Sequence, residues 1–300
     1  MSRIERSKYN IRVEAGEVLH RLGLYRRLLP VFLPNPSGVA RRLQSYLNHF
    51  YEKVEHAEAD LYLPDLGLTF ACDIKDHMLW PYLENEKPIY ELTDINHCRG
   101  QVRPNDHIVD IGANHGFWGF TLAFQAGTTA RVYLCEANPS ILPRLIRTAE
   151  LNPNLASLIL PYAITDGTAA NLAFYLPDGP LSGLGSTVLH AFATGHGYLS
   201  TERQVSVAAR SLDALMDDGT LLGMDVVKID VEQAEDAVVN GAQRALQRFR
   251  PRLLMVETAL GSGATKTLQG MGYQTYCLDE AGHRRPVPTD YWGNIFFVWA

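Results

Sequence analysis

The stretch VDIGANHGFWGF, residues 109–120, places an acid and two glycines directly after a short apolar run. The run Ile108 to Ile111 is typical of a buried strand, and residues 117–124 are typical of a helix. Gly112 and Gly116 therefore fall in a tight strand-to-helix turn, where the missing Cβ lets the backbone bend and approach a ligand closely. We predict that this turn is built around a ligand.

Apolar strands and helical segments alternate from this turn to the end of the chain. Several strands are apolar on both faces, which is typical of a parallel sheet covered by helices. The sequence therefore predicts an α/β fold with a doubly wound, Rossmann-like sheet, in which ligands bind beyond the carboxyl ends of the strands. The expected strands are His107–Ile111, Val132–Glu136, Leu158–Tyr162, Asp225–Ile229, Leu253–Glu257, Tyr273–Leu278 and Ile295–Trp299, and the expected helices are Trp118–Ala126, Ser140–Leu151, Glu235–Phe249 and Thr265–Met271.

The first 60 residues differ from the rest, because two segments with helical periodicity flank the proline-rich stretch PVFLPNPSG. We predict an N-terminal helical cap over residues 1–60 and a main domain over residues 61–300 that begins with a hairpin at Leu61–Phe70. Residues 1–53 carry ten Lys and Arg against four Asp and Glu, a net +6, so a chain of net charge −6 leaves −12 on the remainder. The cap either docks on a membrane, a lipid-linked acceptor or another anionic partner, or packs on the main domain with solvated arginines. The acidic body disfavours nucleic acid as a partner.

Composition and cysteine usage narrow the class of protein. Hydrophobic residues make up 46% and charged residues 20% of the chain, and no apolar run reaches the ~18 residues of a membrane span. The basic, polar start is unlike a secretory signal, so we expect a soluble, cytoplasmic protein. Cys72, Cys98, Cys135 and Cys277 lie far apart without CxxC spacing, which predicts reduced, mostly buried thiols rather than disulfides or a zinc site.

Acids follow the first two expected strands of the sheet. Asp110 precedes Gly112, and Glu136 ends the next strand 26 residues later, where an acid can accept both hydroxyls of a ribose. Asp110 can accept from a ligand ammonium or organise the turn through its amides, and its charge would repel a pyrophosphate. The ligand therefore has a ribose and a positive amine, and S-adenosyl-L-methionine satisfies both conditions.

Two further segments are expected at the same edge of the sheet. Tyr162–Asp166 follows the third strand, where Ala163 or Asp166 would contact the adenine base; alternatively, TDGT is a plain turn. The glycine-rich insertion Asp166–Asp213 either covers the carboxyl edge as part of a substrate pocket or is a flexible excursion.

Three acids end the apolar strand that begins at Val226. Asp230 and Glu232 are expected to act at the reaction edge as base or metal ligand. Glu235 is more simply the start of a helix, where the helix dipole favours a negative charge.

Three motifs together resemble the FkbM-type S-adenosylmethionine-dependent methyltransferases: DIGANHG at 110–116, EANP at 136–139 and KIDVEQAE at 228–235. The resemblance covers about residues 85–280. It implies the class I methyltransferase fold, with a seven-stranded, mostly parallel sheet whose last strand is reversed. It also implies methyl transfer to a hydroxyl, often on a sugar or secondary metabolite, and matches Ile89–Glu91 to a Tyr-Glu element near the methionine part of the cofactor. Gln233 departs from the family pattern, which usually has glycine there, and its side chain could narrow the acceptor pocket.

These observations define a candidate site. A hydroxyl acceptor must lose its proton as it attacks, so a general base is required, and Asp230 is preferred because the strand places it. Glu232 and His115 are further catalytic candidates, with His190 and His196 behind them. The expected cofactor-binding residues are Tyr90, Glu91, Asp110, Gly112, Asn114, Gly116, Glu136, Ala137, Asn138, Ala163, Asp166 and Asp230.

Three alternatives stay open at this point. No metal is expected, but a metal-assisted variant would use Asp230, Glu232 and Glu257 as magnesium ligands. An NAD-linked oxidoreductase is disfavoured by the missing third glycine and by the acid in the turn. A catalytically silent binding module is disfavoured by the intact Gly112, Glu136 and Asp230. The acceptor is a glycan, a polyketide hydroxyl or a lipid-linked sugar, and the sequence does not choose among them or set the oligomeric state.

Overall fold

The fold is described from a computed structural model of the 300-residue chain. The structure describes residues 58–63, 65–73, 76, 79, 88–176, 185–188 and 203–299. The chain divides by its internal contacts into two units, Met1–Tyr90 and Glu91–Ala300. The two helices expected in the N-terminal cap, and also His190 and His196, lie outside the described residues. The domain division at residue 60 therefore stays a prediction.

The first unit contains the hairpin expected at Leu61–Phe70. Strands β1 (Glu58–Leu63) and β2 (Leu68–Asp73) pair antiparallel, with Leu61 opposite Phe70. The turn between them closes on Gly67, which has φ 77° and donates its amide to the carbonyl oxygen of Leu63 at 2.9 Å. The hairpin is confirmed and begins three residues earlier than expected.

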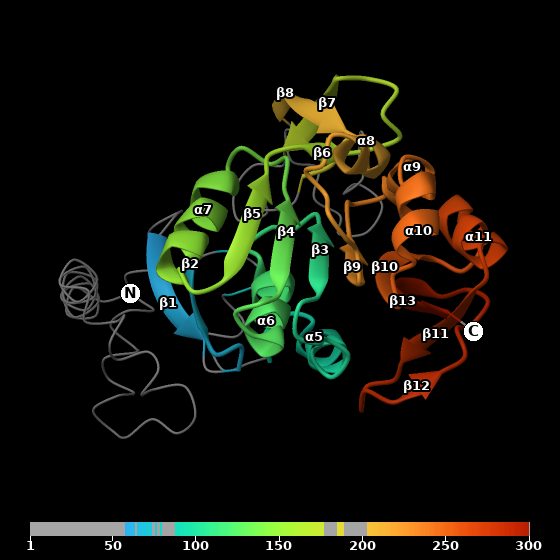
Figure 1. The fold of residues 1–300 in the computed structure, drawn as a ribbon, viewed down its shortest axis with the longest axis horizontal. Coiled ribbons are helices and arrows are strands. Elements are labelled where there is room, and N and C mark those ends of the chain that lie inside the picture. Colours follow the sequence, from blue (N-terminus) through green and yellow to red (C-terminus); the bar gives the residue numbers. More distant parts are fainter. Residues whose placement is uncertain are drawn as a thin grey trace, which may run out of the picture. The chain divides into compact units, whose positions relative to one another are not determined.

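The second unit is built on an eight-stranded sheet in the order β12-β11-β13-β10-β9-β3-β4-β5 (Figure 1). Strands β5, β4, β3, β9 and β10 are parallel, whereas β13 runs antiparallel between β10 and β11. The strands are β3 (His107–Ile111), β4 (Arg131–Cys135), β5 (Ala156–Leu160), β9 (Val226–Ile229), β10 (Leu253–Ala259), β11 (Tyr273–Leu278), β12 (Arg284–Arg285) and β13 (Trp292–Trp299).

This topology confirms the doubly wound, mostly parallel sheet of the class I methyltransferase fold with its reversed last strand. The expectation of seven strands was wrong by one. The eighth is the two-residue strand β12, which turns back so that Arg285 pairs with Cys277 and Arg284 with Leu278 at the end of β11.

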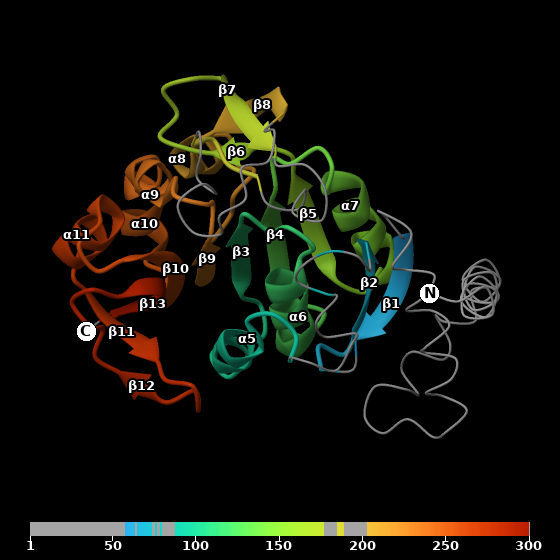
Figure 2. The ribbon, with the colours of Figure 1, turned by 180° about the vertical axis from the view of Figure 1, so that it is seen from behind.

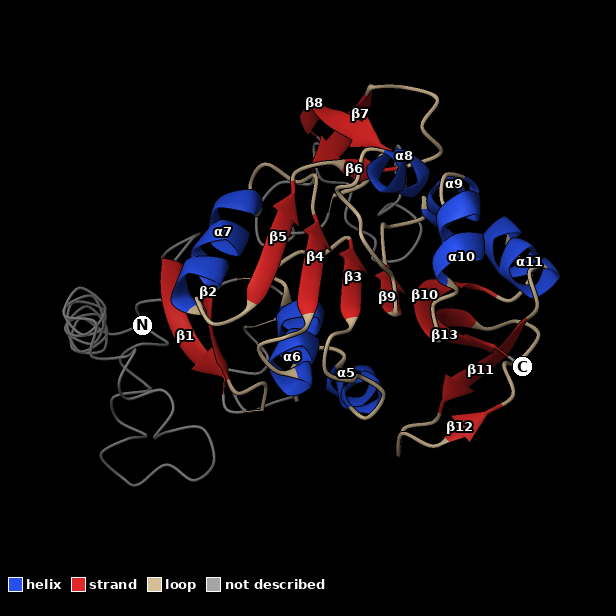
Figure 3. Ribbon diagram, viewed as in Figure 1, coloured by secondary structure: helices blue, strands red, loops and turns tan. Residues whose placement is uncertain are grey.

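The helices flank the sheet in two groups (Figures 2 and 3). Helices α5, α6 and α7 lie around the half with β3 to β5, and α8 to α11 lie around the half with β9 to β13. None of the described helices has the length and apolar content needed to cross a bilayer. Their bounds are α5 (Leu92–Arg99), α6 (Phe117–Ala126), α7 (Leu142–Leu151), α8 (Leu212–Asp217), α9 (Glu235–Asn240), α10 (Gln243–Phe249) and α11 (Gly263–Gly270).

The single helix expected over Glu235–Phe249 was wrong, because the chain forms α9 and α10 with a break at Gly241. The carbonyl oxygen of Gly241 accepts from the amide of Asp213 at 3.0 Å. A Cβ at Gly241 would lie 2.0 Å from the carbonyl oxygen of Thr165. Glycine has a low helix propensity. Its missing side chain also lets the segment with Thr165 pack against Gly241, and the carbonyl oxygen of Gly241 accepts a hydrogen bond from Asp213.

The core lies between the sheet and its helices. All four residues of β9 are buried, as are Val109 and Ile111 of β3, which explains why these strands are apolar on both faces. The four cysteines are buried and form no disulfides, so the expectation of reduced, buried thiols is confirmed.

The described parts of the insertion form a small second sheet together with the strand that precedes the insertion. Strands β6 (Ala163–Ile164), β8 (Arg203–Arg210) and β7 (Asn171–Leu176) pair in that order. Figure 1 shows this sheet beyond the arrowheads of β3, β4 and β5. The described part of the insertion therefore lies over the carboxyl edge, as one of the two readings predicted.

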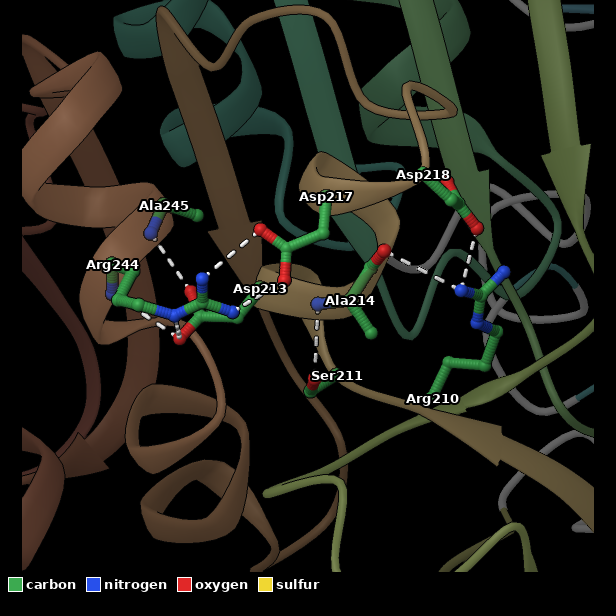
Figure 4. A network of polar contacts seen from close by, with 8 residues as sticks. All are labelled: Arg210, Ser211, Asp213, Ala214, Asp217, Asp218, Arg244 and Ala245. Carbon is green, nitrogen blue, oxygen red and sulfur yellow. Dashed lines mark hydrogen bonds and ion pairs between the residues drawn. The ribbon is translucent and has the colours of Figure 1, made fainter.

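Ion pairs fix α8 between β8 and α10 (Figure 4). Arg210 at the end of β8 lies 2.6 Å from the Oδ2 of Asp218, and Arg244 of α10 lies 2.6 Å from the Oδ2 of Asp217. Asp213 of α8 accepts a backbone N–H of α10 at 2.8 Å. Arg244 and Asp217 are exposed, and exposed ion pairs contribute little to stability.

Candidate active site

The turn between β3 and α6 joins the carboxyl ends of three neighbouring strands. Gly112 has φ 79°, and a Cβ there would lie 1.7 Å from the carbonyl oxygen of Asp230, which follows β9. The amides of Gly112 and Ala113 both donate to the carbonyl oxygen of Cys135, at the end of β4, at 3.0 Å. Glycine at 112 therefore lets the turn pack directly on the loop after β9.

The end of the same turn sets the start of α6. Gly116 has φ 78°, and a Cβ there would lie 2.6 Å from the ring of Phe120 and 2.9 Å from Leu145 of α7. Asn114 also has a left-handed backbone, with φ 50°. Gly116 thus allows α6 to begin close to α7.

Glu136 connects this turn to the loop after β4. Its two carboxylate oxygens accept from the backbone amides of Asn114 and Asn138, each at 2.7 Å. Burial raises the pKa of Glu136, and these backbone donors oppose the rise. Each carboxylate oxygen has a further lone pair, so the carboxylate can still accept from two hydroxyls of a ribose.

His115 belongs to the same turn as Asn114 and is close enough to Glu136 to influence its charge. Its side chain is buried, its ring stacks on that of Phe117 with centroids 5.3 Å apart, and a positive charge on it would lower the pKa of Glu136. The role of His115 as a base stays a prediction, and its position favours packing.

Asp110 is a buried carboxyl with one oxygen available. Its Oδ2 accepts from the amide of Gly119 at 2.9 Å, whereas its Oδ1 has no hydrogen-bond partner among the described residues. Burial raises the pKa of Asp110 to about 7, although Lys228 and the Gly119 amide oppose the rise. A buried acceptor without a partner is costly. A ligand donor such as an ammonium would therefore fit at this position.

A second group of polar side chains is centred on Lys228, the buried lysine of β9. Its Nζ lies 2.7 Å from the Oε2 of Glu91 and 3.1 Å from the Oδ2 of Asp230. Burial opposes the charge of Lys228, but the surrounding carboxylates outweigh it and raise the pKa of Lys228 well above its usual value. We call this group the lysine cluster: Lys228, Glu91, Asp94, Asp230, Glu232, Glu257 and Asn294.

Asn294 closes the lysine cluster from β13. Its Nδ2 donates to the Oε1 of Glu91 at 2.7 Å and to the Oδ2 of Asp94 at 3.1 Å. In the antiparallel register of β10 and β13, Asn294 lies opposite Glu257. Burial, and then the charge of Glu91, raise the pKa of Asp94 to about 6.

Glu257 and Glu232 hold protons near neutral pH. Burial and the charge of Asp230 raise the pKa of Glu257 to about 10 and that of Glu232 to about 8. Glu257 follows Val256, which pairs with Ile229, so Glu257 and Asp230 both come directly after the paired segment of β9 and β10. Among residues 88–176 and 203–299, no three Asp, Glu, His or Cys side chains are arranged to hold a metal ion.

The remaining predicted site residues have local roles or are not placed. Glu235 accepts from the amides of Val231 and Gln233 at 3.1 and 3.2 Å, so it holds the preceding turn besides starting α9. Asp166 is exposed and accepts from the amide of Thr168 at 3.0 Å, which fits the plain-turn reading of TDGT. Ala163 is buried in β6. Tyr90 is exposed at the end of the first unit, and its cofactor contact stays a prediction.

Sequence reasoning missed Asn294 and Asp94 of the lysine cluster. It noted Lys228 only as part of the motif KIDVEQAE. Lys228 and Asn294 each interrupt an otherwise apolar strand, VVKI and WGNIFFVW. A polar residue within such a strand is a usable signal, because buried charges are normally paired. Asp94 gives no comparable signal, since acids are common in the first turn of a helix.

Comparisons with known proteins agree with this geometry. The family model for the methyltransferase FkbM domain matches residues 110–274, more than half of the chain. A hexuronic acid methyltransferase, AglP, of Haloferax volcanii is 29% identical over 147 residues, which are 49% of this chain and 54% of that protein. The chain therefore spans about half the length of this relative.

Solved structures of methyltransferases also align with the chain at low identity. A SAM-dependent O-methyltransferase of Thermotoga maritima is 12% identical with a TM-score of 0.39, covering 85% of this chain and 81% of its own. TYW2 of M. jannaschii, solved in complex with AdoMet, is 13% identical with a TM-score of 0.42, covering 82% and 86%. With its glycine turn, its strand-end acids and the matched domain, the chain belongs to the FkbM methyltransferase family.

Proposed function

We propose that the chain transfers a methyl group to a hydroxyl of a sugar, in a glycan or a secondary metabolite. The observation that carries the proposal is the ion pair of Asp230 with Lys228 at 3.1 Å, beside two carboxyls that hold their protons. The relative from Haloferax volcanii, a hexuronic acid methyltransferase, supports a sugar acceptor.

The glycine turn and Glu136 would hold the cofactor, which supplies a methyl group already activated on a sulfonium. Glu136 would accept from the ribose hydroxyls, and the partnerless Oδ1 of Asp110 would accept from the ammonium of the methionine part. The backbone of Asn114, Gly116, Ala137 and Asn138 would line the same edge, because these residues follow β3 and β4 directly. We place Glu91 beside the reaction, through its contact with Lys228.

Asp230 would accept the proton that the acceptor hydroxyl loses as its oxygen attacks the methyl carbon. Lys228 contacts the Oδ2 of Asp230 and stabilises the ionised carboxylate, so the proton would pass to the other oxygen. Glu257 hydrogen-bonds to Asp230, which helps it to keep its proton. Glu232, which also holds a proton, would donate a hydrogen bond to a neighbouring hydroxyl of the acceptor. The remaining task is alignment of the acceptor oxygen with the methyl carbon.

The Asp230→Asn variant tests this proposal. The full chain is incubated with methyl-labelled S-adenosylmethionine and a panel of neutral and acidic glycosides, and label in the glycoside is measured. We expect turnover to fall by about 100- to 10,000-fold, while cofactor affinity from calorimetry changes little. Asp217→Asn, at an exposed acid of α8, is the matched control and should keep full turnover.

Two outcomes would contradict the proposal. Unchanged turnover in Asp230→Asn would remove Asp230 as the base. Cofactor binding without label transfer to any member of the panel would favour a silent binding module over a sugar methyltransferase.

A further inference from the structure

A short piece of the insertion, Gly185–Val188, bridges two loops at the carboxyl edge. The backbone of Ser186 pairs with that of Tyr175 on β7, with N–H to O distances of 2.8 and 3.2 Å. A Cβ at Gly185 would lie 2.3 Å from the ring of Phe174 and 3.3 Å from the Nδ2 of Asn138, in the loop after β4. This piece therefore packs tightly against the loop that carries Glu136 and Asn138.

The Ser186 side chain reaches the other loop, which follows β9. Its hydroxyl donates to the carbonyl oxygen of Glu232 at 2.6 Å and accepts from the amide of Val188 at 2.9 Å. Ser186 is only 1% exposed. Because a serine hydroxyl has a single proton to donate, Ser186 commits its only side-chain donor to Glu232.

The backbone that Ser186 contacts is strained. Glu232 has φ 55° and Gln233 has φ 75°, so two consecutive residues with side chains are left-handed. This conformation is unfavourable for any residue that carries a Cβ, and it persists only where the surroundings hold it. Glu235 holds the turn by accepting from the amides of Val231 and Gln233. Ser186 holds it at a different point, the carbonyl oxygen of Glu232.

We infer that Ser186 is a positioning residue: by fixing the carbonyl oxygen of Glu232, it keeps the Glu232–Gln233 turn left-handed and the Glu232 carboxyl within the lysine cluster. The inference rests on the proposed function, since Glu232 matters to the reaction only if the lysine cluster is where the acceptor binds. The insertion would then act on the reaction edge through backbone geometry, without touching the reacting atoms.

The titration of Glu232 reports this geometry without any acceptor. Burial and the charge of Asp230 raise its pKa to about 8. If the turn relaxes, the carboxyl moves away from these charges and its pKa falls toward the ordinary value of 4.5. The ionisable groups that face it are Asp230, Glu235, Lys228, Glu91 and Glu257.

The experiment follows the side-chain carboxyl of Glu232 by NMR in ¹³C-glutamate-labelled full chain, with Glu232→Gln to assign its signal. We expect Ser186→Ala to lower the pKa of Glu232 by at least about one unit. Ser211→Ala is the matched control, because Ser211 is a buried serine that accepts from the amide of Ala214 and does not contact the turn. It should leave the titration unchanged.

A second variant separates positioning from general damage. Glycine adopts a left-handed backbone without a Cβ penalty, so Gln233→Gly in the Ser186→Ala background should restore most of the lost shift. If Ser186→Ala does not fold, Ser186→Cys keeps the volume with a weaker donor and should lower the pKa in the same direction.

The inference is overturned by either of two results: a Glu232 titration that Ser186→Ala leaves unchanged, or a lowered pKa that Gln233→Gly does not restore. Both readouts are independent of turnover. If the proposed function alone is wrong, Ser186→Ala should still lower the pKa of Glu232, whereas Asp230→Asn should be fully active.

Discussion

The two halves of the site hold their carboxylates in different ways. In the half that we propose binds the cofactor, called the cofactor half below, Glu136 and Asp110 accept from backbone amides of Asn114, Asn138 and Gly119. In the lysine cluster, the carboxylates instead interact with other side chains, through ion pairs with Lys228 and a hydrogen bond from Asn294. These side chains come from α5, β9, β10 and β13 and from the ends of these elements. The first half depends on backbone shape, and the second depends on a balance of charge.

Because of this difference, we expect the two halves to be disturbed by different kinds of substitution. A Cβ has no room at Gly112, so the cofactor half is sensitive to steric change; its backbone amides keep their dipoles at every pH, although the carboxyl of Asp110, with a pKa raised to about 7, can take up a proton. The lysine cluster has a single cation for its five carboxyl groups. Glu257 and Glu232 hold protons near neutral pH, and these protons reduce the negative charge that Lys228 must offset. Loss of the cation or removal of those protons therefore disturbs the second half.

Gly112→Ala tests the steric sensitivity of the cofactor half and should have the largest effect. The new Cβ would lie 1.7 Å from the carbonyl oxygen of Asp230, so the turn and the loop after β9 cannot both keep their positions. We expect a loss of at least about 4 kcal/mol in the free energy of unfolding, measured by urea denaturation.

Gly219→Ala is the matched control for the backbone conformation alone. Gly219 has φ 77°, close to the 79° of Gly112, but a Cβ there would have no atom within 4 Å. It should cost only about 1–2 kcal/mol. Equal losses at the two positions would mean that the close approach of the turn to Asp230 is not real.

Lys228→Met tests the charge balance of the second half. It removes the cation from Glu91 and Asp230, and a buried ion pair that loses one partner typically costs about 3–5 kcal/mol. Urea denaturation at pH 7 should show this loss. The loss should shrink at pH 5, where the carboxyls take up protons.

Arg244→Met is the matched control, since Arg244 contacts Asp217 at 2.6 Å on the exposed face of α10 (Figure 4). Water screens that pair, so its removal should change stability far less. A comparable loss in the two variants would contradict a special role for burial in the lysine cluster.

The geometry of the glycine turn and its acids could be predicted from the sequence because it follows largely from local patterns. The bounds of β3 and β11 came directly from apolar runs, and the turn, its two glycines and Asp110 are contiguous in the chain. Glu136 was placed because an acid at the next strand end has a limited choice of positions in a doubly wound sheet.

The lysine cluster was only partly predictable because its contacts link distant segments. Lys228 contacts Glu91 across 137 positions, and Asn294 contacts Glu91 across 203. The break at Gly241 and the contact from Ser186 likewise arise from partners far along the chain. A strand pattern shows which residues reach an edge, but it does not show which side chains meet there.

Glu136→Ala tests whether the cofactor half binds the ribose. We expect S-adenosylmethionine to bind about 5- to 150-fold more weakly, or ~1–3 kcal/mol, because charged hydrogen bonds to the ribose are lost. Calorimetry measures the affinity, and denaturation is followed in parallel because Glu136 also holds two backbone amides. Glu150→Ala, at an exposed acid of α7, should bind normally. Unchanged affinity in Glu136→Ala would remove Glu136 from the cofactor site.

The smallest expected effect is a pH slope that comes from the lysine cluster. The pKa of Glu257 is raised from 4.5 to about 10 by burial and by Asp230, so between these values the folded chain holds a proton that the unfolded chain has lost. The stabilisation from this proton is fully present below the unfolded pKa and is lost as pH rises through the folded pKa. Stability should therefore fall with rising pH, by up to about 1.4 kcal/mol per pH unit for this group.

Glu257→Gln separates this contribution from that of its neighbours. The pKa values of Glu232 and Glu235 are raised by burial to about 8 and about 7, so their contributions level off first. Between about pH 8.5 and 9.5 the buried thiols of Cys98 and Cys135, whose pKa values are raised by burial, also contribute to the slope. The contribution of Glu257 is therefore the difference between the two curves, and the variant should lose stability less steeply than the wild type in urea denaturation. Glu280→Gln, at an exposed acid, should keep the wild-type slope. Parallel curves for wild type and Glu257→Gln would show that protons do not balance the charge of the lysine cluster, and the contrast between the two halves would then rest on Lys228 alone.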